Sequence, residues 1–294
     1  MEYTFQSITP SEVSVGKFHQ LLLGTVTPRP IGFISSIDAE GNHNLAPFSF
    51  FNVFGANPPL MIFSPARRVR DNSIKHSLEN AYAIKEVVIN LVDFPMVQQM
   101  SLSSCEYDAG VSEFVKSGLT PIASEIVKPP RVLEAPASFE CEVINIIETG
   151  TEGGAGNLVI CKVVKAHIAS RWLNEAGEID HLKSDMVARL GGDWYARITK
   201  ENMFLVPKPN LKKGIGFDNL PAWLFELPEL GKNELARIAN LEVLPEGKLP
   251  FDLQEDILLN RATVFDLIQK RFEILDDQNA AELLFWAFSK NLLT

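Results

Sequence analysis

Three short clusters of polar, aromatic and basic residues, all within residues 25–73, carry the side chains best suited to holding a ligand. Residues 25–32 read TVTPRPIG, and the two prolines keep this stretch extended, so that backbone polar groups face outward instead of pairing in a sheet. Residues 44–52 read NLAPFSFFN. Such a mixture of aromatic rings with serine and asparagine is expected where a flat heteroaromatic ligand is held.

The third cluster, residues 64–73, reads SPARRVRDNS and combines Arg67 and Arg68 with hydroxyl groups at an expected helix start. Arginine pairs and helix N–H groups bind phosphate well. The arginines are informative because the chain has a formal net charge of -10 and a pI of about 5.1. An acidic protein that binds an anion needs local basic groups to overcome this background.

Each cluster alone has a plainer interpretation. Arg67 and Arg68 could be a solvated surface pair, and the TPRP string could be an ordinary turn. Phe48, Phe50 and Phe51 could simply belong to the core. The order and spacing of the three clusters are what favour a ligand site.

The first two-thirds of the chain predicts short strands with turn residues between them. Strands are expected over residues 32–37, 45–51, 60–64, 87–92, 137–143 and 158–164, the last two joined as a hairpin through the glycine-rich residues 150–156. Short helices are expected over residues 71–80, 94–103 and 112–116, the first capped by Asp71. Many short strands and few long helices favour a mainly β fold, a barrel rather than a doubly wound sheet.

The composition changes near residue 205, where prolines, lysines and glycines resemble a linker. We therefore expect a first domain over residues 1–205 and a helical C-terminal extension over residues 206–294. Its expected helices cover residues 233–240, 252–260, 263–275 and 278–292. The last has Asp277 as its cap and an apolar stripe that includes Leu284 and Phe288. We expect this stripe to dock on the barrel, with a partner subunit as the alternative.

Taken in order, these motifs resemble the flavin reductase-like, FMN-binding split-barrel family over roughly residues 20–200. The likeness rests on residues 27–31, 44–52, 58–59 and 67–68, and on later matches at 113–114, 118–119, 127–131, 140–143, 188–192 and Tyr195. One stretch departs from the family pattern. Arg70, Asp71 and Asn72 replace its Lys-Asp-Thr string, and Lys75 replaces a later asparagine and adds positive charge that partly compensates.

The resemblance implies a six-stranded antiparallel split β-barrel, usually a homodimer, with FMN near the subunit interface. Its implied ring-lining residues are Thr27, Arg29, Pro30 and Ile31. Its implied contacts to the ring and ribityl chain are Ser49, Phe50, Phe51 and Asn52. Its implied phosphate-holding residues are Ser64, Arg67 and Arg68, assisted by Asp71, Asn72 and Ser73, with Arg189 as a weaker candidate for the same pocket.

Other classes of protein are disfavoured by composition. The acidic surface argues against nucleic acid or anionic membranes as partners, and the apolar runs are too short to span a bilayer. The N-terminal residues lack a signal-peptide pattern, so we expect a cytoplasmic protein. The five histidines lack metal-binding spacing, so no metal is expected. Of the three cysteines, Cys141 and Cys161 are expected in the core, and a catalytic role for Cys105 is the lesser alternative.

The leading functional hypothesis is an FMN-dependent oxidoreductase that resembles NAD(P)H:flavin reductases and uses NADH or NADPH as co-substrate. FMN carries the hydride chemistry, so the protein has only to position and shield it. The alternative is a non-catalytic FMN-binding electron carrier, similar to flavoredoxin. A flavin enzyme with another substrate and a relative that has lost the cofactor also remain open.

Overall fold

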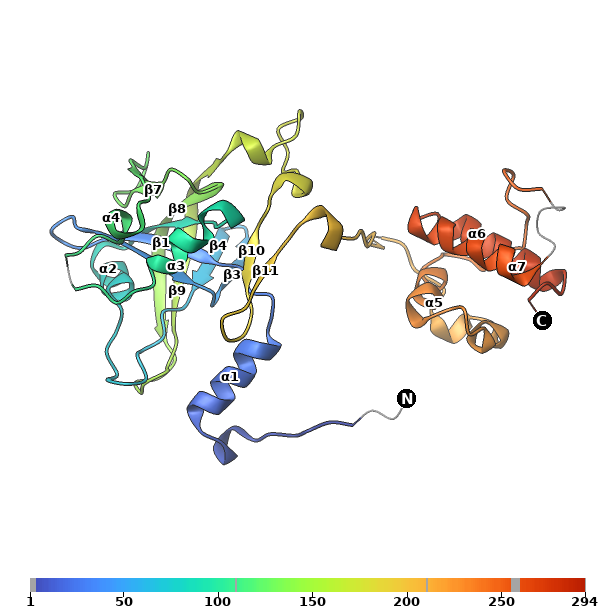
Figure 1. Cartoon of the computed structure of the whole chain (residues 1–294), viewed down its shortest axis with the longest axis horizontal. Helices are drawn as coiled ribbons and strands as arrows, with labels where there is room; N and C mark the ends of the chain where they lie inside the picture. The colour runs from blue at the N-terminus through green and yellow to red at the C-terminus, as the bar shows by residue number, and fades with distance from the viewer. Residues whose placement is uncertain (1–3, 109, 210, 255–259, 294) are drawn as a thin grey trace. The chain divides into compact units, whose positions relative to one another are not determined.

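The computed structural model describes residues 4–108, 110–209, 211–254 and 260–293. It divides into two compact units, Met1–Met203 and Phe204–Thr294, which we describe separately (Figure 1).

The first unit is built on one antiparallel sheet of seven strands in the order β2-β1-β5-β8-β9-β4-β3. Its strands are β1 (Gly32–Ile37), β2 (His43–Phe48), β3 (Phe51–Ala56), β4 (Pro59–Phe63), β5 (Glu86–Asn90), β8 (Ala137–Glu148) and β9 (Asn157–Ile168). The long β8–β9 hairpin, yellow-green in Figure 1, lies in the middle of this order and pairs with β5 on one side and β4 on the other. The expected antiparallel strands and the hairpin through residues 150–156 are confirmed.

Two details of the strand prediction were wrong. The expected strand over residues 45–51 is two strands, because β2 ends at Phe48 and the chain turns at Ser49 and Phe50 before β3. The sheet therefore has seven strands instead of six. Pro47 lies in β2, an edge strand, which is where a residue without an N–H is tolerated.

The sheet curves around a core to which all seven strands contribute. One buried cluster combines Ile34, Phe48, Phe51, Phe63, Ile89, Cys141 and Val159 with Leu78 of helix α2 (His76–Ile84). The ladder is not closed into a barrel in the described residues, since β2 and β3 are the two edges and pair only with β1 and β4. These edges are nevertheless joined directly by Ser49 and Phe50.

Strand β1 is buried throughout because it packs on both faces. Ile34 faces the core just described, whereas Phe33 joins a second cluster with Met96, Met100 and Phe114. That second cluster is covered by η2 (Phe94–Met96), α3 (Val97–Leu102) and α4 (Glu113–Ser117), close to the expected short helices.

Smaller elements complete the first unit. Helix α1 (Val15–Thr25), which the sequence patterns did not indicate, is capped at its start by Ser14, whose side chain accepts a hydrogen bond from Lys17 N. Two short antiparallel pairs follow, β6 (Pro121–Ile122) with β7 (Arg131–Val132) and β10 (Val187–Arg189) with β11 (Tyr195–Arg197). Short 3-10 turns lie at Pro10–Glu12, Ser170–Trp172, His181–Lys183 and Lys200–Asn202.

The second unit is helical and has a core of its own. It contains 3-10 turns at Phe217–Asn219 and Ala222–Glu226, and helices α5 (Lys232–Ala239), α6 (Arg261–Glu273) and α7 (Asp277–Ser289). Three expected helices are confirmed to within a few residues; most of the fourth, at 252–260, lies outside the described residues. The cap of α7 is Asp276, one residue before the expected Asp277.

The apolar stripe of α7 packs inside this second unit. Leu284 is fully buried with Leu224, Ile238 and Ile268, all from the same unit. Ala281 and Leu284 of the stripe are buried within this unit, whereas Phe288 is 42% exposed, so docking of the exposed part on the barrel or on a partner subunit stays a prediction. No helix in the described residues is long and apolar enough to cross a membrane.

Candidate functional site

The three clusters singled out in the sequence meet at the corner between β2 and β3. Ser49 Oγ accepts a hydrogen bond from Arg29 Nε at 3.4 Å, which joins the first cluster to the second. The carbonyl of Phe50 accepts from Ser64 N at 2.8 Å, which joins the second to the third. The edges of the curved sheet thus bring these segments together.

Arg29 holds this corner in place, because its side-chain N–H groups donate to other groups of the protein. Its guanidinium is buried and donates to the carbonyls of Leu23 (2.6 Å), Val26 (2.8 Å) and Leu190 (2.8 Å). Burial, and then the nearby charge of Arg189, lower the pKa of Arg29. The side chain therefore ties the end of α1 to the turn after β10 and orients Ser49.

The other residues implied to line the ring differ in exposure. Ile31 is buried in the core beneath α3, so its side chain lies with that core, whereas Thr27 and Pro30 are half-buried. Gly32 is needed for packing: a Cβ there would lie 2.8 Å from Phe51 Cγ. This glycine lets the aromatic ring of β3 approach the backbone of β1.

The aromatic residues of the second cluster are divided between the core and the surface. Phe48 and Phe51 are core residues, which was the plainer interpretation for them. Phe50 is 40% exposed at the corner and packs edge-to-face with His19 of α1, with ring centroids 6.0 Å apart. Asn52 is exposed on β3, and its Oδ1 accepts from Val53 N.

Asn44, at the start of the second cluster, is fixed by a buried carboxylate. Glu113 of α4 accepts from Asn44 Nδ2 and Leu45 N, both at 2.9 Å, and Ser77 Oγ donates to Asn44 Oδ1 at 2.8 Å. Burial raises the pKa of Glu113. The glutamate anchors α4 to β2 and so fixes the strand that leads into the corner.

The two arginines of the third cluster point to different neighbours. The backbone of Arg67 binds the β8–β9 turn. Its N–H donates to Ala155 O, and its carbonyl accepts a hydrogen bond from Gly154 N. Its Nη1 donates to Asn72 O at 3.1 Å, while its buried Nε has no partner. Arg68 Nη1 donates to Ser73 Oγ (3.0 Å) and Ile74 O (2.7 Å).

The predicted helix start at Asp71 was wrong. Asp71 instead closes a local turn, in which its Oδ1 accepts from Ser73 N (3.0 Å) and Ser73 Oγ (2.6 Å). Aspartate commonly forms such turns in competition with helix caps. The hydrogen bonds from Ser73, and then Arg70, hold the pKa of Asp71 well below its usual range. Asn72 has φ of 59°, and α2 begins only at His76.

Beyond this turn, Arg68 lines a cavity of about 110 Å³ between α2, β2 and the loop after α3. Lys75 and His76 line the same cavity, together with Ser103 and Ser104. Lys75 forms no ion pair in the described residues, and its Nζ lies 5.0 Å from the centre of the Phe48 ring. Burial, and then the charge of Arg68, lower the pKa of Lys75.

The lining of this cavity was only partly predicted from the sequence. Lys75 was expected to compensate in part for a missing family residue, but His76, Ser103 and Ser104 were not among the candidates. No local pattern marks these three, since they come from the helix start at His76 and from a loop about thirty positions later in the chain. The curved sheet and α3 bring them together.

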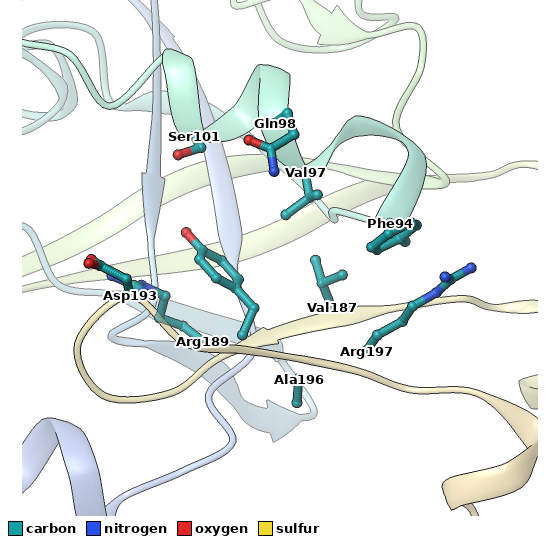
Figure 2. Close-up of a pocket in the computed structure, with 10 residues that line it drawn as sticks. Phe94, Val97, Gln98, Ser101, Val187, Arg189, Asp193, Ala196 and Arg197 are labelled. Carbon is teal, nitrogen blue, oxygen red and sulfur yellow. The ribbon is translucent and has the colours of Figure 1, made fainter.

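Arg189 lies elsewhere. Its backbone pairs with that of Arg29, N–H to carbonyl in both directions at 3.0 and 2.9 Å. Its side chain lines a cavity of about 430 Å³ between α3 and the β10–β11 hairpin (Figure 2). This cavity shares no lining residue with the one beside Arg68. Arg189 was a weaker candidate for the same pocket as Arg68, and the two side chains line different cavities.

The cysteines offer little chemistry. Cys141 and Cys161 are buried, as expected, and burial followed by the charge of Glu140 raises the pKa of Cys141 to about 12. Cys105 is exposed and lines the cavity beside Arg68. Within the described ranges, no group of three or more histidine, cysteine or acidic residues could hold a metal ion.

Comparison with known proteins identifies related chains. Residues 23–181 match the model of the flavin reductase-like domain. A protein of Aquifex aeolicus is 35% identical over 179 residues, covering 61% of this chain and 89% of that protein. The Bacillus subtilis protein YwrF is 31% identical over 210 residues, covering 70% of this chain and 99% of YwrF.

Two solved structures are similar as well. The crystal structure of nitrilotriacetate monooxygenase component B from Bacillus cereus is 31% identical, with a TM-score of 0.65 over 70% of this chain and 100% of that chain. The 2-nitrobenzoate 2-nitroreductase NbaA of Pseudomonas fluorescens is 26% identical, with a TM-score of 0.62 over 74% of this chain and 99% of that chain.

Proposed function

Because the chain belongs to the flavin reductase-like family, we propose that it is an FMN-dependent oxidoreductase with its flavin at the β2–β3 corner. The observation that carries this proposal is the meeting of the three clusters at that corner, next to a cavity lined by Arg68, Lys75 and His76 together with Glu106 and Glu113. Similarity to a monooxygenase component and a nitroreductase supports a redox role.

The residues present fit the charge of FMN. Arg68 and Lys75 would face the phosphate, and Arg67, the neighbour of Arg68 in sequence, has a buried Nε without a hydrogen-bond partner. Buried donors without partners are rare, so such a group favours a ligand acceptor. Phe50 would pack against the flavin ring with Ser49 held by Arg29.

Asp71 and Asn72 fit this arrangement less directly. The carboxylate of Asp71 is already occupied by Ser73 and Arg70, and the amide of Asn72 donates to Thr151 O at 2.9 Å. We propose that both shape the loop that presents Arg67 and Arg68. When bound, FMN would supply the hydride transfer, while the protein holds its phosphate and shields its ring.

We further propose that the protein is a homodimer in which β3 lies at the interface. β3 is an edge strand, and its Val53 and Phe54 are 60% and 62% exposed. Exposed apolar edge strands favour pairing with another chain. Such an interface would cover the corner where the flavin is proposed to bind.

The test begins with the purified protein and FMN. We expect a yellow preparation, or binding of added FMN that quenches flavin fluorescence, followed by oxidation of NADH or NADPH when free flavin is in excess. FMN binding without turnover of either nucleotide would favour the electron carrier. Absence of FMN binding would contradict the proposal.

A further inference from the structure

The cavity between α3 and the β10–β11 hairpin has an apolar middle between two ends that each carry an arginine. Figure 2 shows Arg189 and Asp193 at one end and Arg197 with Phe94 at the other, with Val97 and Val187 between them. Its volume of about 430 Å³ falls in the range of small-molecule sites.

The two arginines differ in how their charges are balanced. Arg197 forms a two-pronged ion pair with Asp185, Nε to Oδ1 at 2.6 Å and Nη2 to Oδ2 at 3.0 Å, and stacks on the Phe94 ring at 3.7 Å. Its charge is therefore neutralised within the protein. This end of the cavity offers an aromatic wall rather than a free cation.

Arg189 has no such counter-charge. Its Nη1 donates to Trp194 O at 3.1 Å, its guanidinium lies 4.5 Å from the centre of the Tyr195 ring, and it forms no ion pair with any described residue, Asp193 included. It also lies close enough to Arg29 for its charge to disfavour protonation of that buried arginine. Asp193 lines the same end of the cavity but forms no ion pair with Arg189, so the Arg189 guanidinium keeps donors for a ligand.

We infer that this cavity is a second ligand site, for a small molecule with one anionic group on an apolar, ring-sized body. The anionic group would pair with Arg189, and the ring would lie between Val97 and Val187 toward Phe94. The contact path from Arg189 through Arg29 to Ser49 links this site to the proposed flavin corner. We assign this site to the substrate of the proposed oxidoreductase, and this assignment rests on the proposed function.

Benzoate is a suitable probe and benzamide is its neutral counterpart. In titrations followed by ligand-observed NMR, we expect the full-length protein to bind benzoate at least tenfold more tightly than benzamide. Arg189→Met should weaken benzoate binding by about ten- to a hundredfold, the effect of losing one charge-assisted hydrogen bond, and leave benzamide unchanged. Arg131→Met, which removes a guanidinium that donates to Ala123 O and does not line this cavity, is the matched control and should bind both probes normally.

A second variant tests the cavity from its other wall. Ser101 is an exposed residue of α3 that lines the cavity, so Ser101→Phe should fold and should abolish binding of both probes. Equal affinity for the two probes, no binding of either, or unaltered benzoate binding by Arg189→Met would overturn the inference. Displacement of benzoate by FMN would overturn it as well, because the cavity would then be the flavin site.

A separate FMN titration distinguishes failure of this inference from failure of the proposed function. FMN binding without Arg189-dependent benzoate binding rejects the second site alone. Arg189-dependent benzoate binding without FMN binding rejects the proposed function and keeps the site.

Discussion

At the scale of single residues, the phosphate assignment depends on charges that the protein does not neutralise. Lys75 is the cleanest case, since it forms no ion pair in the described part of the chain and faces the same cavity as Arg68. Arg68, by contrast, also holds Ser73, Ile74 and Glu106. A substitution of Arg68 therefore changes both the loop and the charge, whereas a substitution of Lys75 changes mainly the charge.

Lys75→Met should weaken FMN binding by about tenfold, corresponding to roughly 1.4 kcal/mol, because one charged contact to the phosphate is lost. Arg68→Met should weaken it by about ten- to a hundredfold. Fluorescence titration measures both. Riboflavin, which lacks the phosphate, should bind all variants alike, and the exposed Lys128→Met is the control. Equal loss of riboflavin and FMN affinity would argue against a phosphate contact.

Glu140 is a buried carboxylate whose role is structural. It accepts backbone N–H groups of Glu125, Ile126 and Val127 at 2.8, 2.7 and 3.1 Å and lies 2.7 Å from His167 Nε2. Burial alone would raise its pKa, but these hydrogen bonds together lower the pKa of Glu140 from 4.5 to about 2. The charged carboxylate thus pins the loop before β7 to β8.

Glu140→Gln should lower the free energy of unfolding by about 2–3 kcal/mol at neutral pH, since an amide replaces a charged acceptor of three N–H groups. Because folding lowers this pKa, the contribution of Glu140 is fully present above pH 4.5 and is lost as the pH falls toward 2. Urea unfolding at several pH values should show the difference between wild type and variant shrinking over this interval. Glu142→Gln, an exposed position on the same strand, should change little; a constant difference down to pH 2 would contradict the assignment.

At the scale of elements, β3 is an edge strand with exposed apolar side chains. It pairs with β4 on one side, while Val53 and Phe54 are exposed. Charges on edge strands prevent pairing with a second chain. The element therefore gives a direct test of the proposed dimer.

Phe54→Glu should convert the dimer to a monomer, halving the mass measured by light scattering after size-exclusion chromatography. Val115→Glu is the matched control, because Val115 is also exposed but lies on α4, and it should leave the mass unchanged. If Phe54→Glu has the mass of the wild type, β3 is not at the interface.

At the scale of the whole molecule, each unit buries its own apolar residues. The two clusters of the first unit lie on the sheet and its short helices, and the cluster of the second unit combines α5, α6 and α7 with residues such as Leu224. None of the three clusters draws on both units. We propose that the units are separate domains with a boundary near residue 204.

A chain truncated after Met203 should therefore fold and keep its β-sheet circular dichroism. Its melting temperature should lie within a few degrees of the matching transition in the full chain, which calorimetry should resolve as two transitions. FMN affinity should be unchanged. Aggregation or unfolding of the truncated chain would contradict independent folding, and loss of FMN affinity alone would instead assign the extension a part in flavin binding.

The sequence by itself determined the local features of this protein. Alternation of apolar and acidic residues predicted β8, glycines predicted the β8–β9 turn, and helical periodicity predicted α6 and α7. These features depend on neighbours two to four positions apart, so local patterns are enough to find them. The order of the three clusters likewise sufficed to indicate the family.

Only the tertiary structure decided which residues share a site. Curvature of the sheet turned Ser49 and Phe50 into a corner, and a local turn at Asp71 moved the start of α2 to His76, beside Arg68. The Arg29 side chain donates to the carbonyl of Leu190, 161 positions later in the sequence. Arg189, next to Leu190, lines a different cavity from Arg68. The physical reason is that such juxtapositions follow from strand order and core packing, which join distant segments and leave no periodic trace in any one of them.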